Sequence, residues 1–262
     1  MSHSAPSSLP CAGRIACDLC HGGPTKFNET RTKSPDGGWR LTANPLAWGN
    51  PRPEVLVLGF SKGPNAQGAL RRKPYDAIAY DGGRIAVGKI LAHVGLLEAG
   101  ANASLRRQVD AAIADPRGRF GWGSLIRCTV ERFDRRKGEW VSSGGGMLDK
   151  FVSGAFGRQV ANACAVRFLS GVPSETRLVV MFGLGSKLNY VRASRRLFEE
   201  VRPGPWRSVN EVAFTDGELT VVHVEHFASQ GAHLPNWLGE NDHPRSGWGC
   251  QAREAVAGAL AV

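Results

Sequence analysis

Four cysteines in three separate segments are the residues whose type and spacing point most directly to chemistry. Cys17 and Cys20 form a C-x-x-C pair near the amino terminus, and Cys128 and Cys164 follow much later. Thiolates from separated segments can close one site, because the C-x-x-C turn supplies two corners and the distant cysteines supply the others. The set predicts either a four-cysteine zinc site or an iron–sulfur cluster. A thioredoxin-like redox pair is the competing interpretation, but such a pair lies at a strand-to-helix junction, and this one precedes every expected strand.

The composition indicates a globular protein with an anionic partner. The chain has 262 residues, of which 42% are hydrophobic, which is enough for a full core. Its 33 Lys and Arg against 23 Asp and Glu give a formal net charge of +10. We expect a polyanionic partner, with nucleic acid ahead of membrane. Simple solubility is the other explanation of this charge.

The amino terminus and the apolar runs bear on the compartment. Residues 1–10 are rich in Ser and Pro and contain no apolar core, so no signal peptide is expected. No apolar run approaches the length of a membrane-spanning helix. We therefore expect a cytoplasmic protein. In a reducing compartment, cysteines serve as metal ligands, catalytic groups or buried apolar residues more often than as disulfides.

Apolar segments that alternate with helical patterns define the expected fold. Strands are expected at 54–58, 122–130, 176–183 and 219–226, and helices at 84–97, 103–114, 147–169, 186–201 and 252–262. Strands that alternate with helices are typical of a parallel sheet covered on both faces. The sequence therefore predicts an α/β fold, a three-layer α/β/α sandwich with a central four-stranded parallel sheet.

One domain, at residues 51–262, is expected to follow an arm. Residues 1–50 are poor in periodic apolar residues and contain several Gly and Pro clusters, which predicts an irregular segment that carries the C-x-x-C pair. Residues 131–146 are polar and basic and end in Ser-Ser-Gly-Gly-Gly. They are predicted to form an exposed, mobile excursion from the domain.

A glycine-punctuated loop, residues 60–68, follows the first expected strand. Ligands of open α/β sheets bind beyond the carboxyl ends of the strands, so this loop is the first candidate for the edge of an active site. Lys62 in this loop could be a Schiff-base nucleophile, but a contact with a phosphate is favoured. Gly183-Leu184-Gly185 lacks the third glycine of a dinucleotide-binding loop, so no nicotinamide cofactor is expected.

The order of these landmarks resembles that of one group of enzymes. The C-x-x-C pair is followed by a strand with a G-x-x-x-G loop, the pair Pro74-Tyr75, a strand ending in Cys, a helix with Cys, a strand ending in Gly and a strand ending in His. Over roughly residues 15–238 this order resembles the uracil-DNA glycosylase superfamily, most closely its iron–sulfur branch, families 4 and 5. The resemblance implies a 4Fe-4S cluster, with zinc as the alternative, at Cys17, Cys20, Cys128 and Cys164.

The resemblance also implies an activity. Such an enzyme would be a DNA glycosylase that hydrolyses the N-glycosidic bond of a flipped uracil or other deaminated or modified base in single- or double-stranded DNA, monofunctional rather than a lyase. His226-Phe227-Ala228-Ser229 matches the family's second motif except for its proline. His226 is therefore expected to donate a hydrogen bond to the leaving base. His243-Pro244-Arg245-Ser246 is closer by letter but follows no strand.

The loop that corresponds to the family's first motif keeps Gly59 and Gly63 but otherwise differs from it. Phe60 stands where this branch usually has a glutamate. Either an amide, Asn65 or Gln67, orients the attacking water, or the base is supplied elsewhere, or hydrolysis is not the reaction. The residues expected to contact the base are Gly59, Phe60, Ser61, Gly63, Tyr75 and Ser124, and those expected to contact DNA are Lys62, Ser229, Leu234 and Trp237.

These expected contacts have separate roles. Tyr75 would stack on the flipped base, and Leu234 and Trp237 would fill the gap that the base leaves.

Because the motif carboxylate is missing, a catalytically silent nucleic-acid-binding module of the same fold is the principal alternative. A hydrolase that acts on modified nucleotides or nucleosides is a third possibility.

Overall fold

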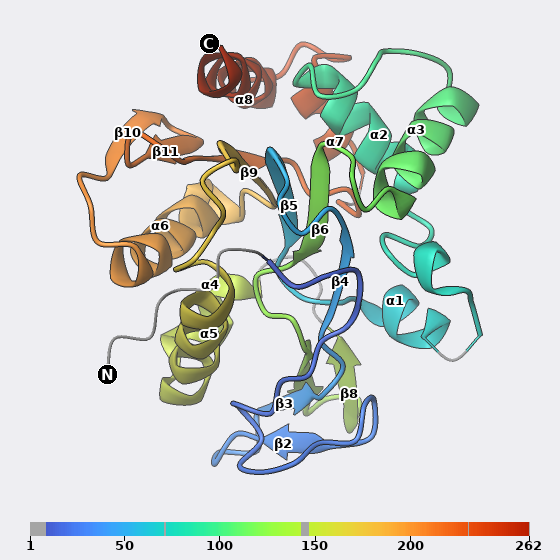
Figure 1. Ribbon diagram of the computed structural model, residues 1–262, viewed down its shortest axis with the longest axis vertical. Coiled ribbons are helices and arrows are strands. Elements are labelled where there is room, and N and C mark those ends of the chain that lie inside the picture. Colours follow the sequence, from blue (N-terminus) through green and yellow to red (C-terminus); the bar gives the residue numbers. More distant parts are fainter. Residues whose placement is uncertain (1–8, 71, 143–146, 230, 262) are drawn as a thin grey trace.

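An eight-stranded mixed sheet forms the centre of the protein (Figure 1). The computed structural model describes residues 9–70, 72–142, 147–229 and 231–261, apart from the side chains of Pro64, Asn65, Gln67 and Ser186. The strand order is β1-β4-β6-β5-β9-β12-β11-β10. The strands are β1 (Gly13–Arg14), β4 (Leu46–Gly49), β5 (Val55–Gly59), β6 (Phe120–Ser124), β9 (Leu178–Phe182), β10 (Arg207–Asn210), β11 (Ala213–Thr215) and β12 (Thr220–Val224).

The four inner strands, β6, β5, β9 and β12, run parallel to one another. Three of them lie where the sequence predicts strands, whereas the strand predicted at 122–130 is wrong in its bounds, because β6 already ends at Ser124. β5 and β9 are buried along their whole length, as expected for strands covered on both faces. The prediction of a four-stranded sheet was too small, because short antiparallel strands extend both edges. A strand of two to four residues leaves little hydrophobic pattern to detect.

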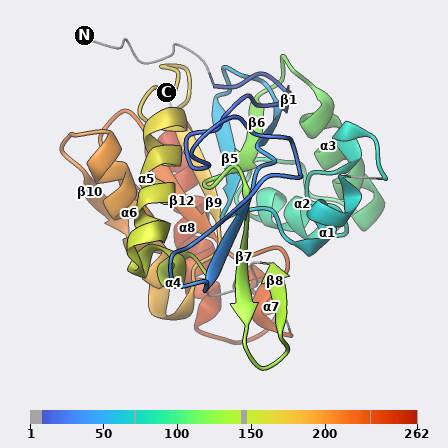
Figure 2. The ribbon, with the colours of Figure 1, turned by 90° about the horizontal axis from the view of Figure 1, so that it is seen from below.

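Helices cover both faces of the sheet, which makes the fold a mixed α/β one (Figures 1 and 2). In both views α2 and α3 lie on one side and α5 and α6 on the other. No helix in the described part of the chain combines the length and the apolar character needed to cross a membrane. The α-helices are α1 (Pro64–Ala69), α2 (Arg84–His93), α3 (Asn102–Ala114), α4 (Leu148–Ser153), α5 (Ala155–Phe168), α6 (Asn189–Val201), α7 (His233–Leu238) and α8 (Arg245–Leu260), with short 3-10 turns η1 (Tyr75–Ala77) and η2 (Ser186–Leu188).

The helix predicted at 147–169 is in fact two helices, α4 and α5. The chain is extended at Gly154, with φ −89° and ψ 157°, so the helical hydrogen bonds stop there. At Gly157 a Cβ atom would collide with the carbonyl of Phe151, which shows how closely the two helices meet. The break turns α4 away from α5 and sends Phe151 into the core.

Parts of the predicted irregular arm and of the predicted mobile excursion form a second sheet, while β1 and β4 of the arm belong to the eight-stranded sheet. The strands of the second sheet, in the order β2-β3-β7-β8, are β2 (Arg31–Lys33), β3 (Trp39–Thr42), β7 (Thr129–Asp134) and β8 (Glu139–Ser142). Residues 131–142 are therefore a paired hairpin and not a mobile excursion, while residues 143–146 lie outside the described residues. Arg40 in β3 binds Glu131 in β7 through two hydrogen bonds of 2.8 Å. The two residues are 91 positions apart in the sequence, so no local sequence pattern predicts this contact.

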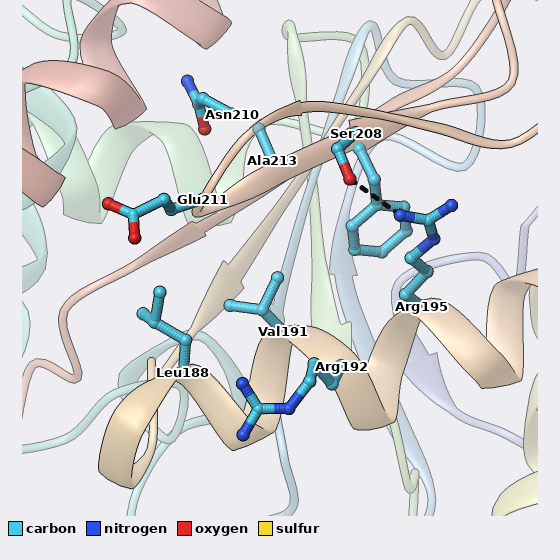
Figure 3. A pocket seen from close by; sticks show the side chains of 9 residues that line it. Leu188, Val191, Arg192, Arg195, Ser208, Asn210, Glu211 and Ala213 are labelled. Atoms are coloured by element: carbon cyan, nitrogen blue, oxygen red, sulfur yellow. Dashed lines mark hydrogen bonds between the residues drawn. The ribbon is translucent and has the colours of Figure 1, made fainter.

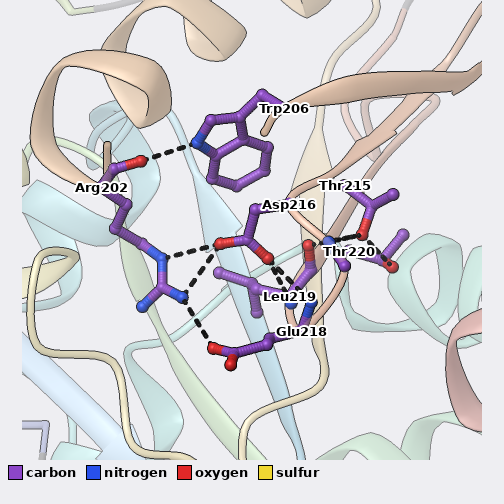
Figure 4. A network of polar contacts seen from close by, with 8 residues as sticks. Arg202, Trp206, Thr215, Asp216, Glu218, Leu219 and Thr220 are labelled. Atoms are coloured by element: carbon purple, nitrogen blue, oxygen red, sulfur yellow. Dashed lines mark hydrogen bonds and ion pairs between the residues drawn. The ribbon is translucent and has the colours of Figure 1, made fainter. Parts of the chain in front are cut away.

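A polar network holds the turn that leads into β12 (Figure 4). Asp216 Oδ1 accepts hydrogen bonds from the backbone N–H groups of Glu218 and Leu219, at 3.0 and 2.7 Å. Its Oδ2 accepts one from Arg202 Nη2 at 3.0 Å, at the end of α6. The turn is thereby tied to α6, and β12 enters the sheet in a fixed register beside β9.

Candidate functional site

The four predicted cysteines come together in the structure, although they lie on different elements. Cys17 and Cys20 follow β1, Cys128 precedes β7, and Cys164 lies on α5. The thiols of Cys20 and Cys164 form a hydrogen bond, and in every one of the six pairs the two thiols are near enough to influence each other's ionisation. All four are free thiols. One centre therefore joins the amino-terminal segment, the connection between the two sheets and a helix of the main domain.

Two kinds of metal group are held by four thiolates, a mononuclear zinc ion and an iron–sulfur cluster. Among the described residues, no three His, Cys, Asp or Glu side chains lie close enough together to hold a single metal ion. Tetrahedral zinc, with Zn–S bonds of about 2.3 Å, holds its sulfurs about 3.8 Å apart. An iron–sulfur cluster binds each thiolate through a different iron atom, so its sulfurs lie farther apart. The donor set suits either group in chemistry.

The protein environment keeps most of these thiols protonated when no metal is bound. Burial raises the pKa of Cys128 to about 11, and the hydrogen bond with Cys20 together with burial raises that of Cys164 well above its usual value. Burial also raises the pKa of Cys17, whereas the hydrogen bond with Cys164 lowers that of Cys20. Because a metal binds thiolates, its binding must release protons.

Two cations lie beside the cysteines, and sequence reasoning had placed one of them elsewhere. Lys62 is only 5% exposed and Nζ donates to the carbonyl oxygen of Arg127. The contact with phosphate expected for Lys62 does not fit this position, since the side chain points into the protein. Arg127, 2% exposed, stacks over the ring of Phe168, with Cζ 5.1 Å from the ring centroid. Its Nε and Nη1 are buried and have no hydrogen-bond partner among the described residues.

His21, which directly follows the C-x-x-C pair, is a further neighbour of the centre. Its Nε2 lies 3.8 Å from Sγ of Cys128, and its Nδ1 lies 2.8 Å from the Thr32 hydroxyl in β2. Burial lowers the pKa of His21. The imidazole is thus held against the centre by the second sheet, and the C-x-x-C-H pattern was the signal for it in the sequence.

The predicted base-binding loop lies at the carboxyl-terminal edge of the parallel strands. Gly59 at the end of β5 pairs with Ser124 at the end of β6. The next two residues after β6, Leu125 and Ile126, donate their backbone N–H groups to the carbonyl oxygens of Gly59 and Phe60. Phe60 is 6% exposed and its ring packs edge-on against Phe151, with centroids 5.9 Å apart. Phe60 is therefore a core residue, and stacking on a base is not supported. Gly63 precedes α1, while the side chains of Asn65 and Gln67 lie outside the described residues.

His226 follows β12 at the same edge of the sheet and has a defined tautomer. Its Nδ1 accepts a hydrogen bond from the backbone N–H of Ala228, at 3.1 Å. The proton of the neutral imidazole must then be on Nε2, which makes no hydrogen bond to any described residue. Burial lowers the pKa of His226 although Glu225 acts in the opposite direction, so the neutral form prevails at neutral pH. His226 therefore keeps one N–H donor without a partner among the described residues.

The residues around His226 fix its orientation. Its ring stacks on that of Phe227, with centroids 4.6 Å apart and an interplanar angle of 22°. The Ser229 hydroxyl donates to the carbonyl of His226 at 2.7 Å, which closes the turn after β12. Ser229 is therefore committed to the turn. The buried carboxylate of Glu225 accepts from the backbone N–H of His226 at 2.9 Å and from Nε of Arg245 at 2.6 Å, so both oxygens are occupied.

Two expected aromatic contacts have structural roles instead. Tyr75 stacks on Trp48, with centroids 5.4 Å apart, and its hydroxyl bonds the backbone of Gly13. It anchors the amino-terminal segment. Trp237 is 0% exposed and packs against His93, with centroids 4.9 Å apart, so the predicted wedge into DNA is wrong for this residue. Leu234 is half-buried and packs on the same core.

A polar pair at the start of α4 and α6 was missed by sequence reasoning. Asp149 Oδ2 accepts a hydrogen bond from Nδ2 of Asn189 at 2.7 Å. The remaining oxygen of each side chain is inaccessible to solvent and has no hydrogen-bond partner among the described residues. Both of these oxygens are acceptors, so the partner that they require is a donor, such as a bound water.

This pair is joined to the His226 region through Tyr190. The Tyr190 hydroxyl accepts the backbone N–H groups of Met147 and Leu148, which fixes the start of α4. A Cβ atom on Gly183 would lie 2.9 Å from the Tyr190 ring and 3.9 Å from the ring of His226. The glycine, with φ +111°, thus lets the loop after β9 pass close to the Tyr190 ring.

His223, three residues before His226, anchors β12 in the core. Its Nδ1 lies 2.8 Å from the carbonyl oxygen of Gly183, and its Nε2 faces the hydroxyl of Ser194. Because a carbonyl only accepts, Nδ1 carries the proton and the Ser194 hydroxyl donates to Nε2. The imidazole is completely buried and neutral.

Acidification is expected to destabilise the protein through His223. Burial lowers its pKa to about 4, whereas the unfolded imidazole titrates at 6.5. Between these values the unfolded state binds more protons, so the free energy of unfolding should fall by about 3 kcal/mol as the pH drops from about 6.5 to 4. Urea unfolding at several pH values measures this slope. The His223→Gln variant should show a shallower slope, and an unchanged slope would contradict the assignment.

A cavity of about 210 Å³ lies between α6 and the β10–β11 hairpin (Figure 3). Arg192 and Arg195 on the helix and Glu211 on the hairpin contribute to its lining. None of the residues singled out in the sequence lines it, so it is separate from the edge that carries His226. A second cavity, of about 310 Å³, is lined in part by Lys73, Asp81 and Arg84.

Comparison with known proteins does not identify a relative. No protein-family model matches the chain, and no curated protein sequence matches it.

Proposed function

We infer that the protein is a monofunctional DNA glycosylase of the uracil-DNA glycosylase type, which hydrolyses the N-glycosidic bond of a flipped uracil or other deaminated or modified base. The observation that carries this proposal is the fixed Nε2–H donor of His226 at the carboxyl end of the last parallel strand. Four parallel inner strands with helices on both sides support the finer, glycosylase-like assignment of the fold. The net charge of +10 supports DNA as the partner.

The chemistry of base excision explains why this donor matters. Cleavage of the N-glycosidic bond builds negative charge on the departing base while the sugar becomes cationic. A preorganised N–H aimed at the base oxygen stabilises that charge, and one such donor contributes about 3–4 kcal/mol. The neutral state of His226 suits it to donate without first taking up a proton.

The four cysteines are proposed to hold a 4Fe-4S cluster, with zinc as the alternative. The convergence of four thiols with two buried cations supports an anionic centre at this position. A bound cluster would supply a structural link between the amino-terminal segment and the domain. The excision chemistry is then left to the residues of the chain at the carboxyl end of β12, at His226.

Asp149 could take the place of the missing carboxylate of the first loop. Glu225 is fully paired, whereas Asp149 keeps one buried oxygen without a described partner. Asp149 also lies two residues before Phe151, which packs on Phe60, the position where the family carries its acid. We therefore assign to Asp149 the role of orienting the attacking water.

Replacing Asp149 with Asn should lower the rate of base release by roughly 10²-fold or more, the usual contribution of a positioned acid–base group. The amide keeps the size of the carboxylate but loses its charge. Single-turnover release of base measures the effect, and Asp76→Asn, at an exposed carboxylate, is the control. Equal rates in the two variants would remove Asp149 from the mechanism.

A catalytically silent DNA-binding module is the second candidate, and the burial of Phe60 favours it. The first loop presents neither a carboxylate nor an exposed Lys62 to a substrate. Oligonucleotides that carry uracil, hypoxanthine, xanthine or hydroxymethylated bases separate the candidates. Free base from any of them supports the glycosylase, and tight binding to abasic or single-stranded DNA without product supports the module. Turnover of mononucleotides alone would indicate a nucleotide hydrolase.

A further inference from the structure

Two buried cations face the four-cysteine centre without any carboxylate between them. Lys62 reaches it from the loop after β5, and Arg127 directly precedes Cys128. Within the described residues, neither side chain forms an ion pair with Asp or Glu. Lys62 interacts electrostatically with the thiol of Cys128, and both Lys62 and Arg127 interact electrostatically with the thiol of Cys164.

The hydrogen bonds of these cations do not offset their burial. Lys62 has a neutral carbonyl oxygen, that of Arg127, as its hydrogen-bond acceptor. Arg127 lies over the aromatic ring of Phe168, and two of its nitrogen atoms have no hydrogen-bond partner in the described part of the chain. Taking an unpaired charge out of water costs several kcal/mol, so buried cations are normally paired with an anion.

The local structure is built to keep Arg127 in this place. A Cβ atom on Gly123 would collide with Nη1 of Arg127, so only glycine at that position of β6 leaves room for the guanidinium. The ring of Phe168 covers its other side, one helical turn beyond Cys164 on α5. The guanidinium is thus enclosed by the sheet and by the same helix that carries a thiol of the centre.

The charge of a loaded centre matches these two cations. Four thiolates carry four negative charges, and a zinc ion or an oxidised 4Fe-4S core contributes two positive ones. The loaded centre is therefore a dianion, and Lys62 and Arg127 carry the two opposite charges. The same two cations have no anionic partner while the thiols are protonated.

We propose that Lys62 and Arg127 are the counter-ions of a dianionic metal centre held by the four cysteines, and that their charge sets its affinity and, for a cluster, its reduction potential. This inference rests on the proposed four-cysteine centre. Residues outside the ligand set that contact a metal site typically change metal affinity by about 10- to 100-fold when replaced.

The Lys62→Met variant tests the proposal, because methionine keeps most of the volume and removes the charge. The variant should lose its metal to a chelator at about 10- to 100-fold lower chelator concentration than the wild type. For an iron–sulfur centre the reduction potential should become more negative, because a positive charge that favours the added electron has been removed. The Lys62→Arg variant should retain the potential and the affinity better than Lys62→Met.

The stability of the metal-free form separates a charge role from a packing role. Without the metal, Lys62→Met removes an unpaired buried charge, so the free energy of unfolding should be unchanged or higher than that of the metal-free wild type. A side chain that only packs would instead destabilise both forms when replaced. Lys150→Met, at an exposed lysine on α4, is the matched control and should change none of these quantities.

The outcomes distinguish this inference from the proposal on which it rests. A wild-type protein that contains no iron or zinc as isolated, and that takes up neither Zn²⁺ nor a reconstituted cluster, would overturn the centre and the counter-ions together. A wild-type protein that holds metal, with Lys62→Met and a Lys62→Met/Arg127→Met double variant of unchanged affinity and potential, would overturn the counter-ion role alone.

Discussion

Replacing His226 with Ala should lower single-turnover base release by about 10²- to 10³-fold, the loss found when one preorganised donor to a developing anion is removed. The variant lacks the Nε2–H that the Ala228 N–H fixes in place through Nδ1. Because the donor acts on the leaving base, the rate of the chemical step should fall with little change in affinity for DNA. Rapid-quench assays at saturating enzyme measure that rate directly.

The matched control for His226 is His243. This residue is exposed, and it belongs to the stretch that is closer to the family motif by letter. His243→Ala should release base at the wild-type rate. A large loss in His243→Ala, with normal activity in His226→Ala, would move the leaving-group donor to the loop between α7 and α8.

Replacing Cys128 with Ser should abolish metal binding and weaken the whole protein. Cys128 lies between β6 and β7, so the centre that it completes joins the two sheets. Structural zinc sites contribute about 10–16 kcal/mol of apparent binding free energy, which equals or exceeds the stability of an ordinary domain, about 5–15 kcal/mol. The metal content should fall to a small fraction of one centre per chain, and the midpoint of thermal unfolding should fall steeply.

Two other cysteines are controls for this experiment. Cys11 and Cys250 are exposed and lie outside the cluster of four thiols. The Cys11→Ser and Cys250→Ser variants should retain the metal and the unfolding midpoint of the wild type. Equal metal content in Cys128→Ser and Cys250→Ser would show that the four cysteines do not form the proposed ligand set.

The inner sheet could be predicted because its strands are continuous apolar runs. The segment Val55–Gly59 is buried along its whole length and is bounded by Pro and Gly, so the local pattern and the tertiary environment agree. The cysteines also came together as their spacing indicated. In each case a single segment, or a single residue type, carried the information.

The second sheet was beyond prediction because its pairing is not local. β3 and β7 lie about ninety residues apart in the sequence. Their polar residues are typical of a loop, and only the contact between Arg40 and Glu131 in the folded chain explains them. The same reason explains Lys62 and Arg127. Their charge suggests the surface, and only the cysteines of other segments give them a reason to be buried.

The side chains of the site were harder to assign than the strands that hold them. Trp237 was expected to be a wedge, but it packs against α2 and α8 from within α7 and is fully buried. Phe60 follows a strand at the correct edge, yet its ring turns into the core against Phe151. The direction of a side chain depends on what packs against the element, which the spacing of residues along the chain does not contain.

The products formed from a uracil-containing oligonucleotide test the central claim most directly. The protein as isolated should release free uracil and leave an intact strand with an abasic site, which breaks only after alkali treatment. No covalent complex should be trapped by borohydride, because Lys62 is buried and does not attack the sugar. If the oligonucleotide is recovered unchanged, and strands with the other deaminated or modified bases are also unchanged, the protein is not a DNA glycosylase.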